Sequence, residues 1–175
     1  MVVIVTGAIG IGKTTVCEEV IKIIRNKGYS CGGIITYKIR NEDIVIEDIR
    51  TGTTNHFAST QNIYTGPRTE KYCFNPEGIE FGIQAIEKGI SSDVLVVDEI
   101  GQLELSGEGF TNVIEQINSC KIKNCILVIR KTLLSDFLPH LGAETLVFET
   151  TLDNRNQLPM EISRVLSRVI AQEHI

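Results

Sequence analysis

The sequence has no excess of positive charge and no long apolar run. Its 22 aspartates and glutamates outnumber its 17 lysines and arginines, so the formal net charge is -5 at pH 7. We therefore expect no nucleic-acid partner and no attraction to an anionic membrane. No stretch approaches the ~20 apolar residues of a membrane span, and the first apolar run, residues 2–5, is too short for the core of a signal peptide. We expect a cytoplasmic protein.

Cysteine and histidine are too sparse and too scattered to suggest a metal cluster. The chain has five cysteines and three histidines, and no two cysteines are spaced as CxxC. Structural zinc sites need clustered ligands of these types. We expect buried free thiols instead, as in proteins of a reducing cytoplasm.

Short β-branched runs alternate with amphipathic segments along most of the chain. The pattern predicts buried strands at residues 2–5, 94–97, 125–129 and 146–148, and helices at 13–27, 79–89, 110–117, 133–141 and from Pro159 onward. Residues 33–49 predict an antiparallel hairpin, and residues 51–75 a long polar loop. Residues 1–175 are therefore expected to form one α/β domain of three layers, with a largely parallel sheet and an added hairpin.

The strongest motif follows the first predicted strand. The pattern GxxxxGK[ST] is matched by Gly7, Ala8, Ile9, Gly10, Ile11, Gly12, Lys13 and Thr14, with Thr15 next in the predicted helix. Glycines let successive backbone N–H groups turn toward phosphate, and the helix N-terminus adds positive potential. Lys13 is expected to reach the β- and γ-phosphates, and the Thr14 hydroxyl to ligate magnesium. The motif predicts binding of a nucleoside triphosphate with Mg²⁺.

An acidic pair follows the strand predicted at residues 94–97. Asp98 would hold the magnesium shell at the same sheet edge as the phosphate loop. Glu99 would orient an attacking water, which favours hydrolysis. Residues 98–101 also fit the DxxG pattern that ends at Gly101 and senses the γ-phosphate in switch GTPases. Those proteins read guanine with NKxD, which does not follow the strand at 125–129, so a switch GTPase is disfavoured.

Further polar residues are candidates for the nucleotide site because they lie at the ends of predicted strands and helices. Arg130 follows a predicted strand and would stabilise the charge that develops on the transferred phosphoryl group, together with Lys13. Asn154 and Arg155 precede the last helix, where many folds with this loop hold the base. The roles of Arg40, Arg68 and Lys71 stay open.

Three strings resemble one family in their order and spacing: GAIGIGKTT near the start, DEIGQLEL from residue 98 and DNRNQL from residue 153. The family is that of the small nucleoside-triphosphatases called cancer-related NTPases, also known from thermophilic microbes. The resemblance spans nearly the whole chain. It implies a RecA-like P-loop fold, magnesium-dependent hydrolysis of NTP to NDP and phosphate, and broad base tolerance.

This sequence departs from the family pattern at two places. Where the family reads T-x-E-x-R, Lys38 replaces the Glu, while Thr36 and Arg40 match. The family's G-x-Y becomes Glu70-Lys71-Tyr72, without the glycine. Neither departure touches the phosphate loop or the acidic pair, so they bear on substrate preference.

Two other functions share this site. In a kinase of nucleotides or small metabolites, the polar residues 51–75 would form an acceptor lid. Glu99 and the presence of a single arginine in that stretch, Arg68, argue against it. In a nucleotide-dependent switch or assembly factor, hydrolysis would only reset the protein. The physiological substrate, any protein partner and the oligomeric state are not specified by these residues.

Overall fold

Within residues 1–142 and 144–173, which the computed structural model describes, eight strands form one sheet in the order β5-β4-β3-β2-β6-β7-β1-β8. Five strands are parallel: β1 (Val2–Gly7), β2 (Cys31–Lys38), β6 (Val94–Ile100), β7 (Cys125–Arg130) and β8 (Thr145–Thr150). The hairpin strand β3 (Ile44–Asp48) and two further strands, β4 (Thr54–Ser59) and β5 (Cys73–Phe74), extend the sheet in antiparallel fashion. The predicted α/β fold is confirmed.

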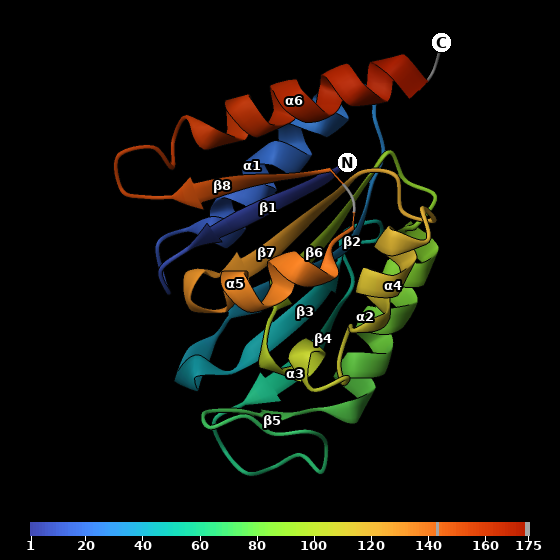
Figure 1. Ribbon diagram of the computed structural model, residues 1–175. Helices are drawn as coiled ribbons and strands as arrows, with labels where there is room; N and C mark the ends of the chain where they lie inside the picture. The colour runs from blue at the N-terminus through green and yellow to red at the C-terminus, as the bar shows by residue number, and fades with distance from the viewer. Residues whose placement is uncertain (143, 174–175) are drawn as a thin grey trace.

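Helices cover both faces of the sheet (Figure 1). Helices α1 (Lys13–Asn26) and α6 (Leu158–Glu173) pack on one face, and α2 (Pro76–Gly89), α4 (Asn112–Asn118) and α5 (Leu134–Phe137) on the other. Because successive side chains of a strand point to opposite faces, Val3 and Val5 contact the first layer and Ile4 the second. This burial on both faces explains the continuous apolar runs. No helix in the described ranges is long and apolar enough to cross a membrane.

Residues 51–75 are not the uninterrupted loop that the sequence predicts. They contain β4, which pairs with β3, and the short β5. In β4 only Phe57 and Ala58 are apolar, so the residues show no alternating pattern. The strand forms because β3 offers an open edge, and that edge exists only in the folded sheet.

The prediction of one continuous helix at residues 133–141 is also wrong. The chain there forms the 3₁₀ turn η2 (Lys131–Leu133), then α5, then the 3₁₀ turn η3 (Leu138–His140). Pro139 lies in η3, where its missing N–H group and bulky ring prevent a longer helix. The short helix α3 (Gln102–Leu105) is not predicted at all.

All five cysteines are free thiols. Cys17, Cys31, Cys73 and Cys125 are buried as expected, whereas Cys120 is exposed after α4. Burial raises the pKa of Cys31 to about 11 and that of Cys125 to about 12. These two buried thiols are therefore protonated and unreactive at neutral pH.

Parallel pairing brings the predicted site residues to one edge of the sheet. Gly7, at the end of β1, lies opposite Arg130, at the end of β7. β7 separates β1 from β6, the strand that ends in the acidic pair. Two strand spacings leave about 10 Å between the start of the phosphate loop and that pair, enough room for phosphate groups and a metal ion.

Candidate active site

The phosphate loop connects β1 to α1 and depends on glycine conformations. Gly7, Gly10 and Gly12 have φ angles of 147°, 75° and 105°, a region that side-chain-bearing residues rarely adopt. A Cβ atom on Gly7 would also lie 2.8 Å from the Thr150 carbonyl oxygen. The loop therefore needs glycine at these places, and Gly12 is the N-cap of α1.

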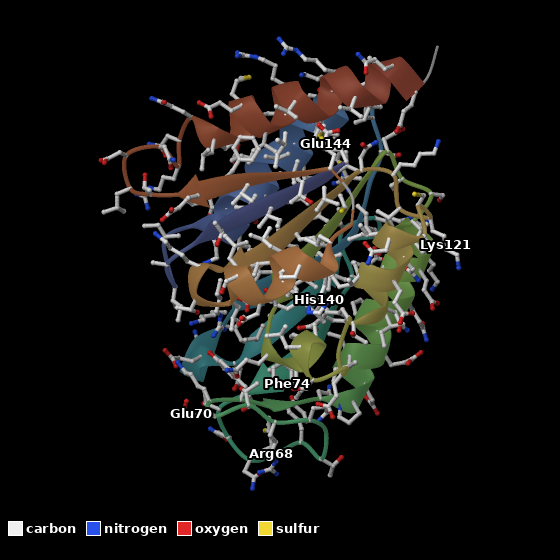
Figure 2. All side chains as sticks on the ribbon, in the orientation of Figure 1. Arg68, Glu70, Phe74, Lys121, His140 and Glu144 are labelled. Carbon is white, nitrogen blue, oxygen red and sulfur yellow. The ribbon has the colours of Figure 1, made fainter. Side chains whose placement is uncertain are left out.

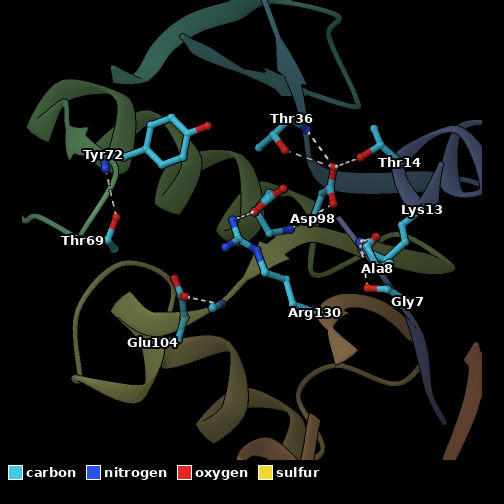
Figure 3. A network of polar contacts seen from close by, with 12 residues as sticks. Gly7, Ala8, Lys13, Thr14, Thr36, Thr69, Tyr72, Asp98, Glu104 and Arg130 are labelled. Atoms are coloured by element: carbon cyan, nitrogen blue, oxygen red, sulfur yellow. Dashed lines mark hydrogen bonds and ion pairs between the residues drawn. The ribbon is translucent and has the colours of Figure 1, made fainter. Parts of the chain in front are cut away.

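Lys13 lies folded over this loop. Its ammonium donates hydrogen bonds to the carbonyl oxygens of Gly7, at 3.2 Å, and Ala8, at 2.8 Å (Figure 3). Partial burial lowers the pKa of Lys13, while the charges of Glu99 and then Asp98 oppose that shift. The two carbonyl bonds are the contacts that phosphate oxygens would replace.

Asp98 is fully buried and accepts four hydrogen bonds at the end of β6. Its Oδ2 accepts from the Thr14 hydroxyl at 2.9 Å, the Thr36 N–H at 3.2 Å and the Thr36 hydroxyl at 3.1 Å, and its Oδ1 from the Glu99 N–H at 3.0 Å (Figure 3). Burial, and next the charge of Glu99, raise the pKa of Asp98 to about 6, while the Thr36 and Thr14 bonds oppose the rise.

Asp98 and Thr14 have the chemistry of a magnesium site. Carboxylate and hydroxyl oxygens are the hard ligands that Mg²⁺ prefers, completed by water and phosphate oxygens. The Thr14 hydroxyl can keep donating its proton to Asp98 while its lone pairs face a metal ion. Burial disfavours the ionised form of Asp98, and a cation bound beside the carboxylate would offset this free-energy cost.

Glu99 has a backbone conformation unusual for its residue type. Its φ is 67°, and the pairing of β6 with β7 shifts register between Val97 and Ile100. In a regular strand, Glu99 and Asp98 would point to opposite faces. The bulge interrupts that alternation at Glu99, whose charge has a larger effect on the pKa of Lys13 than any other neighbouring charge. Left-handed strain of this kind is concentrated at functional sites.

The Glu99 carboxylate is paired with Arg130. Glu99 Oε2 lies 3.4 Å from Arg130 Nη2, and the two side chains are 34% and 42% exposed. At that exposure and separation the pair contributes little to stability. Arg130 is therefore free to turn toward a developing phosphate charge.

Two polar residues of this site were not predicted from the sequence. Thr36 anchors Asp98 from β2, and Glu104 is buried in α3. Glu104 accepts hydrogen bonds from the N–H groups of Gly101, at 2.7 Å, and Phe110, at 2.9 Å. Burial raises the pKa of Glu104, against these bonds. Its position three residues after Gly101 is the capping-box spacing, which the sequence did offer as a signal.

A pocket of ≈ 400 Å³ lies between the start of α1 and the turn that precedes α6. Gly12, Thr15, Glu19 and Arg155 are among its lining residues, and the Arg155 Cδ lies 3.9 Å from the position of a Cβ on Gly12. The sequence predicts that Asn154 and Arg155 act together at the base, but the two side chains have different surroundings. The Asn154 side chain accepts from the Thr151 N–H at 2.8 Å and donates to the Glu149 carbonyl at 2.9 Å, so it closes the turn between β8 and α6 and presents Arg155.

Three other basic residues were left without a role by the sequence. Arg40 is exposed in the 3₁₀ turn η1 (Arg40–Glu42). Arg68 bonds the side chain of Asn62 and points outward with the loop between β4 and β5 (Figure 2). Lys71 forms an ion pair with Glu42 and lines a cleft of ≈ 220 Å³ whose wall includes Glu99.

Comparison with known proteins places the chain in one family. A family model described as NTPase matches residues 2–163. Nucleoside-triphosphatase THEP1 of Methanosarcina barkeri is 32% identical over 91% of this chain and 93% of that protein. THEP1 of Pyrococcus abyssi is 30% identical over 94% and 93%.

Solved structures agree with this assignment. The crystal structure of THEP1 from Aquifex aeolicus superposes with a TM-score of 0.76 at 25% identity, covering 95% of this chain and 99% of the other. The solution structure of a human cancer-related nucleoside triphosphatase gives 0.75 at 21% identity, over 94% and 96%, and shows the shared fold. The chain thus belongs to the NTPase family, and the predicted enzyme class, a nucleoside-triphosphate hydrolase, is confirmed.

Proposed function

We propose that this protein hydrolyses NTP to NDP and phosphate with Mg²⁺, with Glu99 activating the water. The observation that carries the proposal is the bulge at Glu99, whose carboxylate pairs with Arg130 and acts on the charge of Lys13, while Asp98 stays buried next to Thr14. A phosphate-binding site that only held nucleotide would not need a strained carboxylate at this position.

Binding begins with the loop of residues 7–14. Phosphate oxygens replace the Gly7 and Ala8 carbonyls as partners of the Lys13 ammonium. The helix α1 N-terminus adds positive potential at the same point. Lys13 then stabilises the bound triphosphate and the transition state to a similar extent.

Thr14 and Asp98 would hold the magnesium ion, Asp98 through water. The ion supplies charge neutralisation on the β- and γ-phosphates. Thr36 keeps Asp98 in place through its two hydrogen bonds to Oδ2. The site is thereby built from three segments, α1, β2 and β6.

Glu99 takes the proton of the attacking water, and Arg130 stabilises the phosphoryl group. The Glu99–Arg130 ion pair opens when the triphosphate arrives, since the γ-phosphate competes for the guanidinium. Opening the pair leaves the carboxylate available as a base.

The base and ribose occupy the pocket beside Arg155. The guanidinium can stack on any base, which supports broad base tolerance. The free thiols and the acidic net charge support a cytoplasmic location without a nucleic-acid partner.

Glu99→Gln tests the proposal, because it keeps the side-chain shape and removes the basic oxygen. Turnover of ATP and GTP without any added acceptor or protein should fall at least ~100-fold. Affinity for Mg-ATP should be unchanged or slightly tighter, since one negative charge near the phosphates is lost. Glu87→Gln, an exposed change on α2, is the matched control.

Single-turnover phosphate release beside a binding isotherm separates the two effects. A Glu99→Gln protein that hydrolyses ATP within a few-fold of the unmodified protein would remove this residue from the mechanism. Release that requires a partner protein would favour a switch.

A further inference from the structure

Two buried carboxylates hold the backbone on either side of Glu99. The Glu99 N–H group donates to Oδ1 of Asp98 at 3.0 Å. Two residues later, the N–H group of Gly101 donates to Oε2 of Glu104 at 2.7 Å (Figure 3). Asp98 belongs to the proposed magnesium site, whereas Glu104 has no part in the mechanism so far. A buried carboxylate is rare unless its partners require it, so Glu104 needs an explanation of its own.

Glu104 connects the end of β6 to the hydrophobic core. Its second oxygen, Oε1, accepts a hydrogen bond from the N–H group of Phe110 at 2.9 Å. Phe110 is 2% exposed, and its ring stacks on that of Phe57 with the centroids 5.6 Å apart. Hydrogen bonds between backbone N–H groups and a carboxylate are among the stronger ones. The carboxylate therefore ties the residue that follows β6 to a residue fixed in the core.

Glu104 is not placed to act as a second base. Each of its oxygens already accepts a backbone N–H group, and its side chain is buried. The two carboxylates still lie within electrostatic reach of one another. Burial is the main cause of the raised pKa of Glu104, and the charge of Glu99 adds to it. Any effect of Glu104 on hydrolysis is therefore exerted through the neighbouring backbone.

The backbone at Glu99 depends on contacts on both sides. Its φ angle of 67° lies in the left-handed region, which a residue with a side chain keeps only where its surroundings enforce it. On one side, Asp98 holds the Glu99 N–H group. On the other, Ile100 is buried and pairs with Ile129 of β7, and the bond to Glu104 fixes the next peptide group.

We propose that Glu104 is a positioning residue for hydrolysis, which holds Gly101 and thereby the direction of the Glu99 carboxylate before the nucleotide arrives. The inference rests on the proposed role of Glu99 as the base. It also separates this protein from a switch. The Gly101 N–H group that ends the DxxG pattern is already bonded to a carboxylate of the same chain. The order of this segment therefore does not depend on a γ-phosphate.

Two glycines of the following loop offer a matched pair of variants. Gly107 and Gly109 have left-handed φ angles of 77° and 60°, so alanine strains the backbone similarly at either place. A Cβ atom on Gly109 would collide with Oε1 of Glu104, whereas one on Gly107 meets no other described atom within 4 Å. Because the colliding atom ends a flexible side chain, Gly109→Ala can fold by displacing the carboxylate. Gly107→Ala is the control.

Glu104→Gln is the second variant. It keeps the size of the side chain, but its amide has one acceptor oxygen in place of two. One of the two backbone N–H groups therefore loses its partner. Gly109→Ala keeps the test decisive if Glu104→Gln fails to fold, which circular dichroism shows.

The measurements are kcat and KM for Mg-ATP without any acceptor, beside a binding isotherm. Each variant is also made in the Glu99→Gln protein, where single-turnover phosphate release replaces kcat. Comparing the two backgrounds isolates the part of the effect that passes through Glu99. Hydrogen exchange at residues 101–110, with and without Mg-ATP, reports whether the segment is ordered beforehand.

We expect kcat to fall roughly 10-fold or more in Gly109→Ala and Glu104→Gln, since misplacing a catalytic group by about 1 Å can cost about 100-fold. Affinity for Mg-ATP should stay unchanged in both, because the phosphate loop is not touched. Gly107→Ala should match the unmodified protein. In the Glu99→Gln background all three changes should have little further effect on the rate. The N–H groups of Gly101 and Phe110 should exchange slowly even without nucleotide.

Three results would overturn the proposal. Gly109→Ala that hydrolyses ATP as fast as Gly107→Ala would limit Glu104 to a structural role. An equal loss of rate in both backgrounds would show that Glu104 acts through a group other than Glu99. Slow exchange at Gly101 and Phe110 that appears only with Mg-ATP would assign the ordering to the nucleotide. By contrast, a Glu99→Gln protein that keeps its turnover without any further substitution would count against the proposed base itself.

Discussion

Asp98 should destabilise the metal-free protein, although we propose that it serves nucleotide binding. Its pKa is about 6 in the folded state against 3.8 for an ordinary aspartate. The folded protein then binds more protons than the unfolded chain between these two values, so stability falls as pH rises from about 4 to 6. Since each pKa unit corresponds to 1.36 kcal/mol, the difference between 3.8 and about 6 costs about 3 kcal/mol, fully present above about pH 7.

Asp98→Asn removes that charge and keeps most of the contacts. The amide oxygen can take the place of Oδ2 and accept the three bonds from Thr14 and Thr36. The amide nitrogen then faces the Glu99 N–H, so one hydrogen bond worth about 1 kcal/mol is lost. We expect the metal-free variant to be about 2 kcal/mol more stable at pH 8, an advantage that shrinks as pH falls toward 4.

The measurement is urea unfolding followed by circular dichroism, since the chain has no tryptophan. It is made in EDTA without nucleotide at pH 5 and pH 8, with the exposed Asp153→Asn as the control for net charge. An isotherm should show Mg-ATP binding lost in Asp98→Asn. A variant that is less stable than the unmodified protein at pH 8 would show that the carboxylate stabilises the fold, and the argument from burial would be refuted.

Three other outcomes follow from the site. Lys13→Ala should weaken triphosphate binding and hydrolysis together with an unchanged circular dichroism spectrum, because Lys13 contacts loop carbonyls and not the core; unchanged affinity would disprove the loop assignment. The kcat/KM values of ATP, GTP, CTP and UTP should differ by about 10-fold or less, roughly 1.4 kcal/mol, and a 1,000-fold preference would reveal a base-specific pocket. Arg155→Ala should raise KM for all four nucleotides with kcat unchanged; a selective effect on one base contradicts stacking.

Much of the fold and the phosphate loop could be predicted because their signals are contiguous. β1 is apolar on both faces, and the proposed phosphate-binding loop consists of eight successive residues whose backbone would hold the phosphates. The position of Asp98 at the sheet edge follows from strand direction alone. The turn held by Asn154 and the start of α6 are local features as well.

Only the tertiary structure decided the parts that depend on distant segments. The bonds from Thr36 to Asp98 join residues 62 positions apart, and no local periodicity encodes such a pair. β4 exists because β3 leaves an edge open. The bulge at Glu99 arises from the pairing of β6 with β7, and with it the direction of the proposed base. The local sequence pattern indicates on which face of a strand or helix a side chain lies, whereas the pairing of distant strands determines which residues it contacts there.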